Sequence, residues 1–110
     1  MAEILLDAVT ATGASSTWEL RRLVTEHVVQ ITMGGDVVAT AVTVDLEGSL
    51  DDSNWFTLIS HPLSGAEIIA EGAMFHVNNK LVLFVRVNLT TLTGGTNPTV
   101  TVIYDGEAFK

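Results

Sequence analysis

The sequence predicts an all-β domain, an antiparallel β-sandwich or jelly roll of about seven or eight short strands. Apolar and polar residues alternate with a period of two along much of the chain, and clusters of Gly, Asn, Asp and Pro separate the alternating runs. No stretch shows a persuasive helical period. With 110 residues, of which 47% are hydrophobic, the chain can form one core, so we expect a single domain over residues 1–110.

The N-terminal part combines one strand with a polar segment. Residues 4–9 predict a strand, and residues 10–17 are small and polar, which indicates a loop or a flexible arm. Residues 1–17 are therefore expected to form an N-terminal arm or an edge strand. Residues 18–23 alternate poorly, so both a strand and a turn of helix stay open there.

The next two strands are expected to form a hairpin. Residues 27–33 and 37–47 both alternate, and Gly34-Gly35-Asp36 between them permits the positive φ of a tight turn. In the second strand Val42, Val44 and Leu46 share one face, and the opposite face becomes acidic towards Gly48. The apolar face therefore predicts the core side of the sheet.

The middle of the chain alternates between turns and short strands. Residues 55–59 predict a strand that begins at Trp55, and His61-Pro62 indicates a loop because the residue before a proline disfavours helix. Residues 66–70 and 74–77 are short extended candidates.

Two longer strands complete the predicted sheet. Residues 80–89 form the longest apolar run, and Asn78-Asn79 before it favours a turn. One face of this strand is expected to carry Leu81, Leu83, Val85, Val87 and Leu89. Residues 99–104 predict the closing strand.

Charge and composition exclude several classes of function. The formal net charge is −8, from 13 acidic and 5 basic residues, so a nucleic-acid backbone would be repelled. The chain has no cysteine and no apolar run near the roughly 18 residues that a membrane helix needs. The N-terminus lacks the features of a signal peptide, and we expect a soluble protein made in the cytoplasm.

No residue pattern predicts catalysis, a cofactor or a metal centre. His27, His61 and His76 lack a short ligand spacing, so we interpret them as surface or half-buried histidines. The segment 51–54 (D-D-S-N) has oxygen ligands that calcium prefers, but its residues also favour turns, and turn chemistry is the better interpretation. We expect Trp55 in the core and assign Trp18 more readily to an interface.

Several segments resemble small structural proteins of tailed bacteriophages. These segments are V-D-L-E-G-S-L-D-D-S-N-W-F-T-L at 44–58, F-V-R-V-N-L-T-T-L-T-G-G-T at 84–96, the V-T-V closing strand at 100–102, and T-A-T-G-A-S-S at 10–16. The resemblance implies a virion protein without catalytic activity. The role that it implies is a decoration or cement protein on the outer capsid surface, a homotrimer that contacts the major capsid protein.

The resemblance also implies where contacts are made. Residues 2–18 would form an arm or edge strand that reaches a neighbour, a form of strand addition. The interface residues expected on this hypothesis are Ile4, Leu6, Trp18, Arg21 and Arg22. Two alternatives stay open. One is a phage tail or baseplate component, and the other is a carbohydrate-binding adhesion module with exposed aromatic residues that stack on a glycan.

Overall fold

The computed structural model describes residues 3–108, and the side chains of residues 21–23 and 107–108 lie outside the described part. Eight strands and one helix occur within these residues. In chain order they are β1 (Glu3–Val9), β2 (Gly13–Ala14), β3 (Trp18–Gly34), β4 (Ala41–Ser49), β5 (Phe56–Pro62), α1 (Gly65–Ala70), β6 (Gly72–Val77), β7 (Val82–Thr93) and β8 (Thr99–Ala108).

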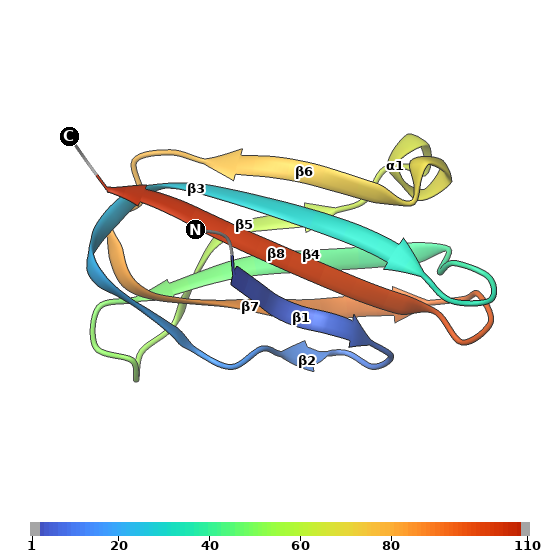
Figure 1. Ribbon diagram of the computed structural model, residues 1–110, viewed down its shortest axis with the longest axis horizontal. Helices are drawn as coiled ribbons and strands as arrows, with labels where there is room; N and C mark the ends of the chain where they lie inside the picture. Colours follow the sequence, from blue (N-terminus) through green and yellow to red (C-terminus); the bar gives the residue numbers. More distant parts are fainter. Residues whose placement is uncertain (1–2, 109–110) are drawn as a thin grey trace.

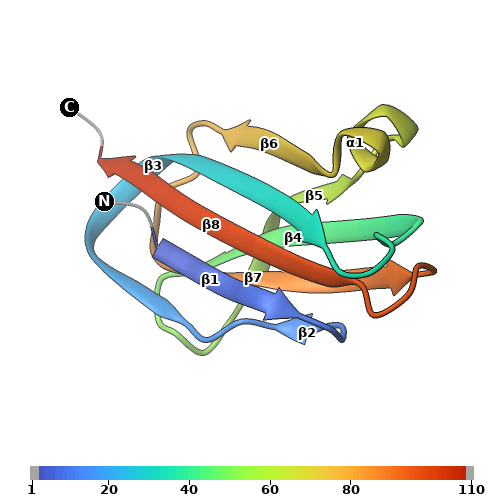
Figure 2. The ribbon, with the colours of Figure 1, turned by 45° about the vertical axis from the view of Figure 1, so that its right-hand side comes forward.

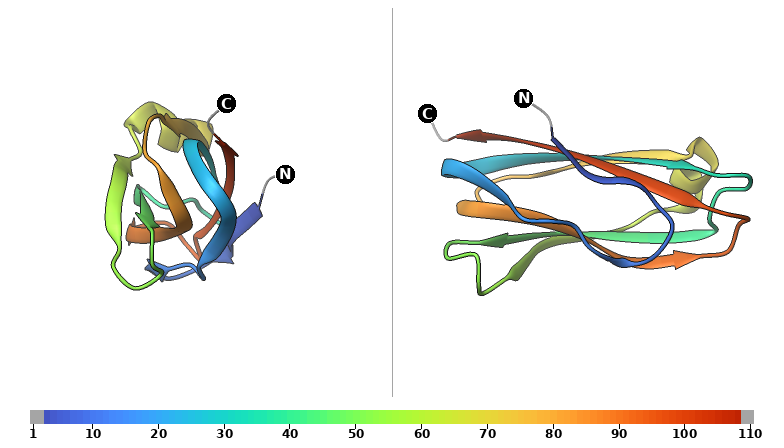
Figure 3. Two further views of the ribbon diagram at one scale, coloured as in Figure 1. Left: turned by 90° about the vertical axis from the view of Figure 1, so that its left-hand side faces the viewer. Right: turned by 60° about the horizontal axis from the view of Figure 1, so that its bottom comes forward.

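The strands form two antiparallel layers that pack face to face (Figures 1 and 3). One layer has the order β1-β8-β3-β6, and the other contains β7, β4 and β5, with β2 added to β7. The predicted all-β sandwich is confirmed. The two layers are continuous through β3, because Trp18 and Glu19 pair with β7 whereas the strand from Val24 onward pairs with β8.

The predicted hairpin between residues 27–33 and 37–47 is wrong. β3 and β4 lie in different layers, and the chain crosses between them through residues 35–40 (Figure 2). Val37 instead forms an isolated antiparallel bridge with Thr96, in the second crossing between β7 and β8. The alternation of apolar residues determines which face of a strand is buried, but it does not determine which strand lies beside it. Gly35, at φ 103, suits a crossing between layers as well as a hairpin turn.

Residues 66–70 are helical rather than extended. Ser64 and Glu67 form a capping box: the Glu67 N–H donates to the Ser64 hydroxyl at 3.2 Å, and the Ser64 N–H donates to Glu67 Oε1 at 2.9 Å. His61-Pro62 is not a loop either, since β5 continues through Pro62, at an edge strand where proline is tolerated. At six residues, α1 is too short to cross a membrane, and no other helix occurs in the described residues.

The N-terminal segment is attached to the domain along most of its length. Residues 18–23 belong to β3, which settles the alternative in favour of a strand. Within the expected polar loop, Gly13 and Ala14 pair with β7, and the Ser15 N–H donates to the Val87 carbonyl at 2.7 Å. β1 pairs with β8 and is the edge strand of its layer, so of the two expectations for residues 1–17 the structure shows an edge strand over residues 3–9.

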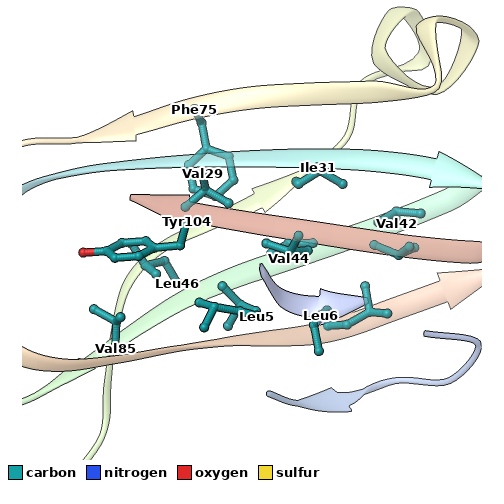
Figure 4. Packing of buried hydrophobic residues seen from close by; sticks show 14 of the residues in the cluster. Leu5, Leu6, Val29, Ile31, Val42, Val44, Leu46, Phe75, Val85 and Tyr104 are labelled. Atoms are coloured by element: carbon teal, nitrogen blue, oxygen red, sulfur yellow. The ribbon is translucent and has the colours of Figure 1, made fainter. Parts of the chain in front are cut away.

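The core lies between the layers, and β1 contributes to it (Figure 4). Leu5 and Leu6 are both buried although they are consecutive, because the pairing of β1 with β8 shifts between Ile4 and Leu6. Leu6 was expected at an interface, and its place in the core leaves it no surface for a partner.

The inner faces of the long strands are apolar as predicted. The buried side chains of β4 and β7 include most of the two faces expected from the sequence: Val42, Val44, Leu46, Val85, Val87 and Leu89. The face expected for residues 80–89 is wrong at its start, where Leu81 is exposed, Leu83 is half-buried and Val82 is buried instead.

We predict that Leu6→Ala destabilises the fold by about 3 kcal/mol, because it leaves a cavity in the core. Ile4→Ala, one register step away and 52% exposed, is the matched control and should cost less than about 1 kcal/mol. Urea unfolding followed by circular dichroism measures both values. Equal and small losses would show that β1 does not pack on the core in solution.

Candidate functional site

An apolar groove of about 480 Å³ lies at one end of the sandwich, between the β4–β5 loop and the start of β7. In Figure 1 both segments are at the left end, opposite α1. The groove is lined by Gly48, Ser49, Leu50, Asp51, Asn54, Phe56, Leu58, Leu81 and Val82.

Three large apolar side chains around the groove are exposed to solvent. Phe56 is 70% exposed, Leu50 is 60% exposed and Leu81 is 49% exposed. Single exposed apolar residues are ordinary on a protein surface, but a group that lines one groove indicates a binding surface. The groove is therefore our candidate functional site.

A glycine forms part of the floor of this groove. A Cβ at Gly48 would lie 2.6 Å from Val82 Cγ1 and 3.1 Å from Leu58 Cδ1, so any larger residue would displace both side chains. The groove thus depends on β4 having no side chain at this position.

The β4–β5 loop is held by its own polar groups. Asp51 Oδ1 accepts hydrogen bonds from the N–H groups of Ser53 and Asn54 and from the Ser49 hydroxyl, at 2.9–3.0 Å, and Oδ2 accepts one from the Asn54 amide. These bonds, above all the one from the Asn54 N–H, hold the pKa of Asp51 far below its usual range. Turn chemistry is confirmed for residues 51–54, and the described residues contain no group of ligands that could hold a metal ion.

Trp55 is not in the core, contrary to the expectation. It is half-buried on the outer side of the sheet, where the Arg86 guanidinium lies 4.4 Å from the centre of its ring. Arg86 Nε in turn donates to Glu47 Oε1 at 2.6 Å. The face of β4 that the sequence predicted as acidic thus carries an ion pair that a tryptophan covers.

The other expected interface residues are distributed over several positions. Trp18, which was assigned more readily to an interface, packs against the core, edge-on to Tyr104 with 5.5 Å between ring centres. Ile4 is exposed on β1, away from the groove residues. Arg21 and Arg22 lie in β3, and their side chains are outside the described residues.

His27 is a buried structural histidine. Its Nε2 lies 2.8 Å from the Lys80 carbonyl oxygen and must carry the proton, so Nδ1 accepts from the Tyr104 hydroxyl at 2.5 Å. Burial lowers the pKa of His27, with a smaller opposing effect from the Lys80 carbonyl, and burial raises the pKa of Tyr104. The pair connects β3 and β8 to the residue that precedes Leu81 of the groove.

The other two histidines lie elsewhere. His61 Nε2 is 3.2 Å from both carboxylate oxygens of Glu67 and its ring stacks on Phe75, so it joins α1 to β5 and β6. The Ser64 N–H is the main cause of the lowered pKa of Glu67, and His61 adds to it. His76 is exposed on β6. The structure does not bring the three histidines together as a metal site.

Sequence reasoning missed the three exposed residues of the groove. Leu50 and Leu81 each stand beside turn residues, and such a position was a usable signal for exposure. Phe56 could not be placed in this way. The pairing of β5 with β4 shifts between Leu46 and Glu47, and this shift changes which residues of β5 face outward.

Comparison with known proteins finds similarity of structure only. No family model and no curated protein matches the sequence. A module named CBM32-3, from a family 31 glycoside hydrolase of Clostridium perfringens, superimposes with a TM-score of 0.62 and 13% identity, over 92% of this chain and 72% of that one.

Two phage-derived proteins have the same fold. The SPBc2 prophage-derived protein YomS matches with a TM-score of 0.55 and 11% identity, over 94% of this chain and 90% of its own. The PBSX exported protein XepA matches with a TM-score of 0.63 and 13% identity, over 100% of this chain and 38% of its own. At identities this low, the superpositions establish the shared sandwich fold alone. That fold occurs both in phage-derived proteins and in carbohydrate-binding modules.

We predict that His27 makes the stability depend on pH. The pKa of His27 is lowered in the folded chain from 6.5, so below about pH 6.5 the unfolded chain binds a proton that the folded chain does not. Stability should therefore fall as the pH drops through this value, by at most about 1.4 kcal/mol per pH unit, until the lowered folded pKa is reached. Urea midpoints between pH 7.5 and 5.5 should fall in wild type and in the exposed control His76→Gln. In His27→Gln this slope should be lost, and an unchanged slope would contradict the assignment.

Proposed function

We propose that the chain is a non-enzymatic structural protein of a bacteriophage particle that decorates the outer capsid surface and contacts the major capsid protein. The observation that carries the proposal is the groove with its exposed Leu50, Phe56 and Leu81. A groove lined mainly by apolar side chains suits protein–protein contact rather than chemistry. The sequence resemblance to phage structural proteins and the phage-derived structural neighbours support the particle as its location.

A decoration protein acts by mass action. If it binds the assembled lattice and not the separate subunits, its binding free energy adds to the stability of the shell. The net charge of −8 supports this role, since it keeps free copies soluble before they meet the lattice.

The structure favours the groove over the N-terminal arm as the contact surface. Leu5 and Leu6 of β1 are in the core of the same chain, so an arm that includes them could reach a neighbour only by opening the domain. A role in the tail or baseplate would use the same surface, and the experiment below separates the two locations.

We predict that Phe56→Ser weakens binding to phage heads by about tenfold or more, since the side chain at the centre of such a contact carries much of the binding energy. The matched control is Ile69→Ser, because Ile69 is 84% exposed on α1 at the opposite end. The measurement is co-sedimentation of each variant with purified heads and, separately, purified tails of the phage that encodes the chain. Binding to tails alone would move the protein to the tail, and binding to neither would refute the proposal.

Carbohydrate binding is a second candidate function, favoured by the exposed Phe56 ring beside the Asn54 side chain in the groove. An aromatic face next to an amide is an arrangement on which a sugar ring can stack. Against it, Asp51 already uses both carboxylate oxygens within the loop.

If this second function is correct, a glycan in the groove should alter the fluorescence of Trp55, the residue next to Phe56, and Phe56→Ala should abolish the change. A glycan array followed by a fluorescence titration provides the measurement. A titration in which wild type and Phe56→Ala respond alike would exclude the groove as a sugar site.

A further inference from the structure

We infer that the groove binds the same groove of a second copy of this chain, so that two copies meet end to end across a two-fold axis. This inference rests on the proposed function, because it concerns the same contact surface. Free copies pair through the groove, and a copy must leave the pair before its groove can contact the capsid protein. The contact would be isologous: both copies use the same patch, and each contact between two residues occurs twice.

The apolar part of the argument concerns the three exposed side chains. Leu50 and Phe56 come from one wall of the groove and Leu81 from the other, with the floor at Gly48 and Val82 between them. A two-fold contact places the ring of Phe56 from one copy in the groove of the other, and the reverse. A single contact then buries the exposed apolar side chains at this end of both copies.

The charges on the two walls complement each other across a two-fold axis. Exposed Asp52 lies in the β4–β5 loop beside the groove residue Asp51, and exposed Lys80 directly precedes the groove residue Leu81. Neither side chain forms an ion pair within the described residues. When the groove meets a copy of itself, Lys80 of one copy faces Asp52 of the other, and the pair forms twice.

The rest of the surface opposes association in other orientations. The chain has 13 acidic and 5 basic residues, so most faces of one copy repel most faces of another.

The size of this end predicts a weak and reversible dimer. The molecule measures 41 × 24 × 21 Å. The β4–β5 loop and the start of β7, which line the groove, lie at one end of the long axis (Figures 1 and 3). A contact that is limited to this end is small, so we expect a weak and transient association. A contact of this strength leaves monomers in dilute solution, and the groove of a monomer is free to contact the capsid protein.

Sedimentation velocity over about 5–500 µM protein tests the inference. Wild type should show a reversible monomer–dimer equilibrium, and Phe56→Ser should weaken the association by about tenfold or more. Ile69→Ser should leave the equilibrium unchanged. Because Phe56 is 70% exposed, its replacement should not unfold the protein, and circular dichroism of each variant checks this.

Charge exchange tests the geometry of the contact. Lys80→Glu and Asp52→Lys should each weaken the dimer by about tenfold, since each removes two attractive pairs and creates two repulsive ones. The double variant Lys80→Glu/Asp52→Lys restores both pairs with the charges reversed, so its association should return to within about threefold of wild type. Both effects should shrink at 0.5 M salt, whereas the loss caused by Phe56→Ser should persist.

Several outcomes would overturn the inference. These are a strict monomer over the whole concentration range, a stable trimer, a dimer that Phe56→Ser does not weaken, or a double variant that associates no better than the single ones. A monomer whose Phe56→Ser form fails to bind phage heads would overturn the dimer and leave the decoration function intact. A dimer that binds neither heads nor tails would support the dimer contact and refute the proposed function.

Discussion

The buried hydrogen bonds of Tyr104 and His27 are the interaction on which the candidate site depends. The Tyr104 hydroxyl lies among apolar side chains of the core and would be costly to bury without a partner. His27 Nδ1 accepts a hydrogen bond from this hydroxyl, and His27 Nε2 donates one to the Lys80 carbonyl. Two hydrogen bonds therefore link two strands of one layer and the β6–β7 turn. Since Lys80 directly precedes Leu81, the same two bonds position one wall of the groove.

The opposite wall, the β4–β5 loop, is positioned by a different set of hydrogen bonds. Asp51 collects hydrogen bonds from the loop around it, and a lowered pKa means that its carboxylate keeps these bonds over the whole range of ordinary pH. Gly48 then leaves room for Leu58 and Val82 to pack over β4. The groove is thus a space between two independently fixed walls, and neither wall needs a ligand to hold its shape.

The sequence predicted the layers of this fold better than their connections. Alternation placed Val42, Val44 and Leu46 correctly in the core, because the period of two depends only on the strand itself. The partner of each strand depends on contacts distant in sequence, and the expected β3–β4 hairpin failed for this reason. The six-residue helix was missed although Ser64 and Glu67 have the spacing of a capping box, since so short a segment has no helical period to detect.

The candidate site was less predictable still. The loop bonds of Asp51 followed from turn chemistry, but the exposure of Phe56 depends on a shift in the pairing of two strands, which no local pattern reports. The tryptophans were misplaced for a related reason. A tryptophan at the start of a strand can point to either layer surface, and only the paired structure puts Trp55 against Arg86 and Trp18 against Tyr104.

The distribution of charge and apolar surface together restricts how this molecule can be used. Similar sandwiches occur in proteins of different kinds, so the fold alone does not select a function. This chain is strongly acidic, and three of its exposed apolar side chains line one groove at one end, beside exposed charges of both signs. Electrostatic repulsion disfavours contact through the long sides, and the apolar groove favours contact through that end. A partner is therefore expected to approach along the long axis, which is a requirement on orientation that a lattice-bound structural protein can satisfy.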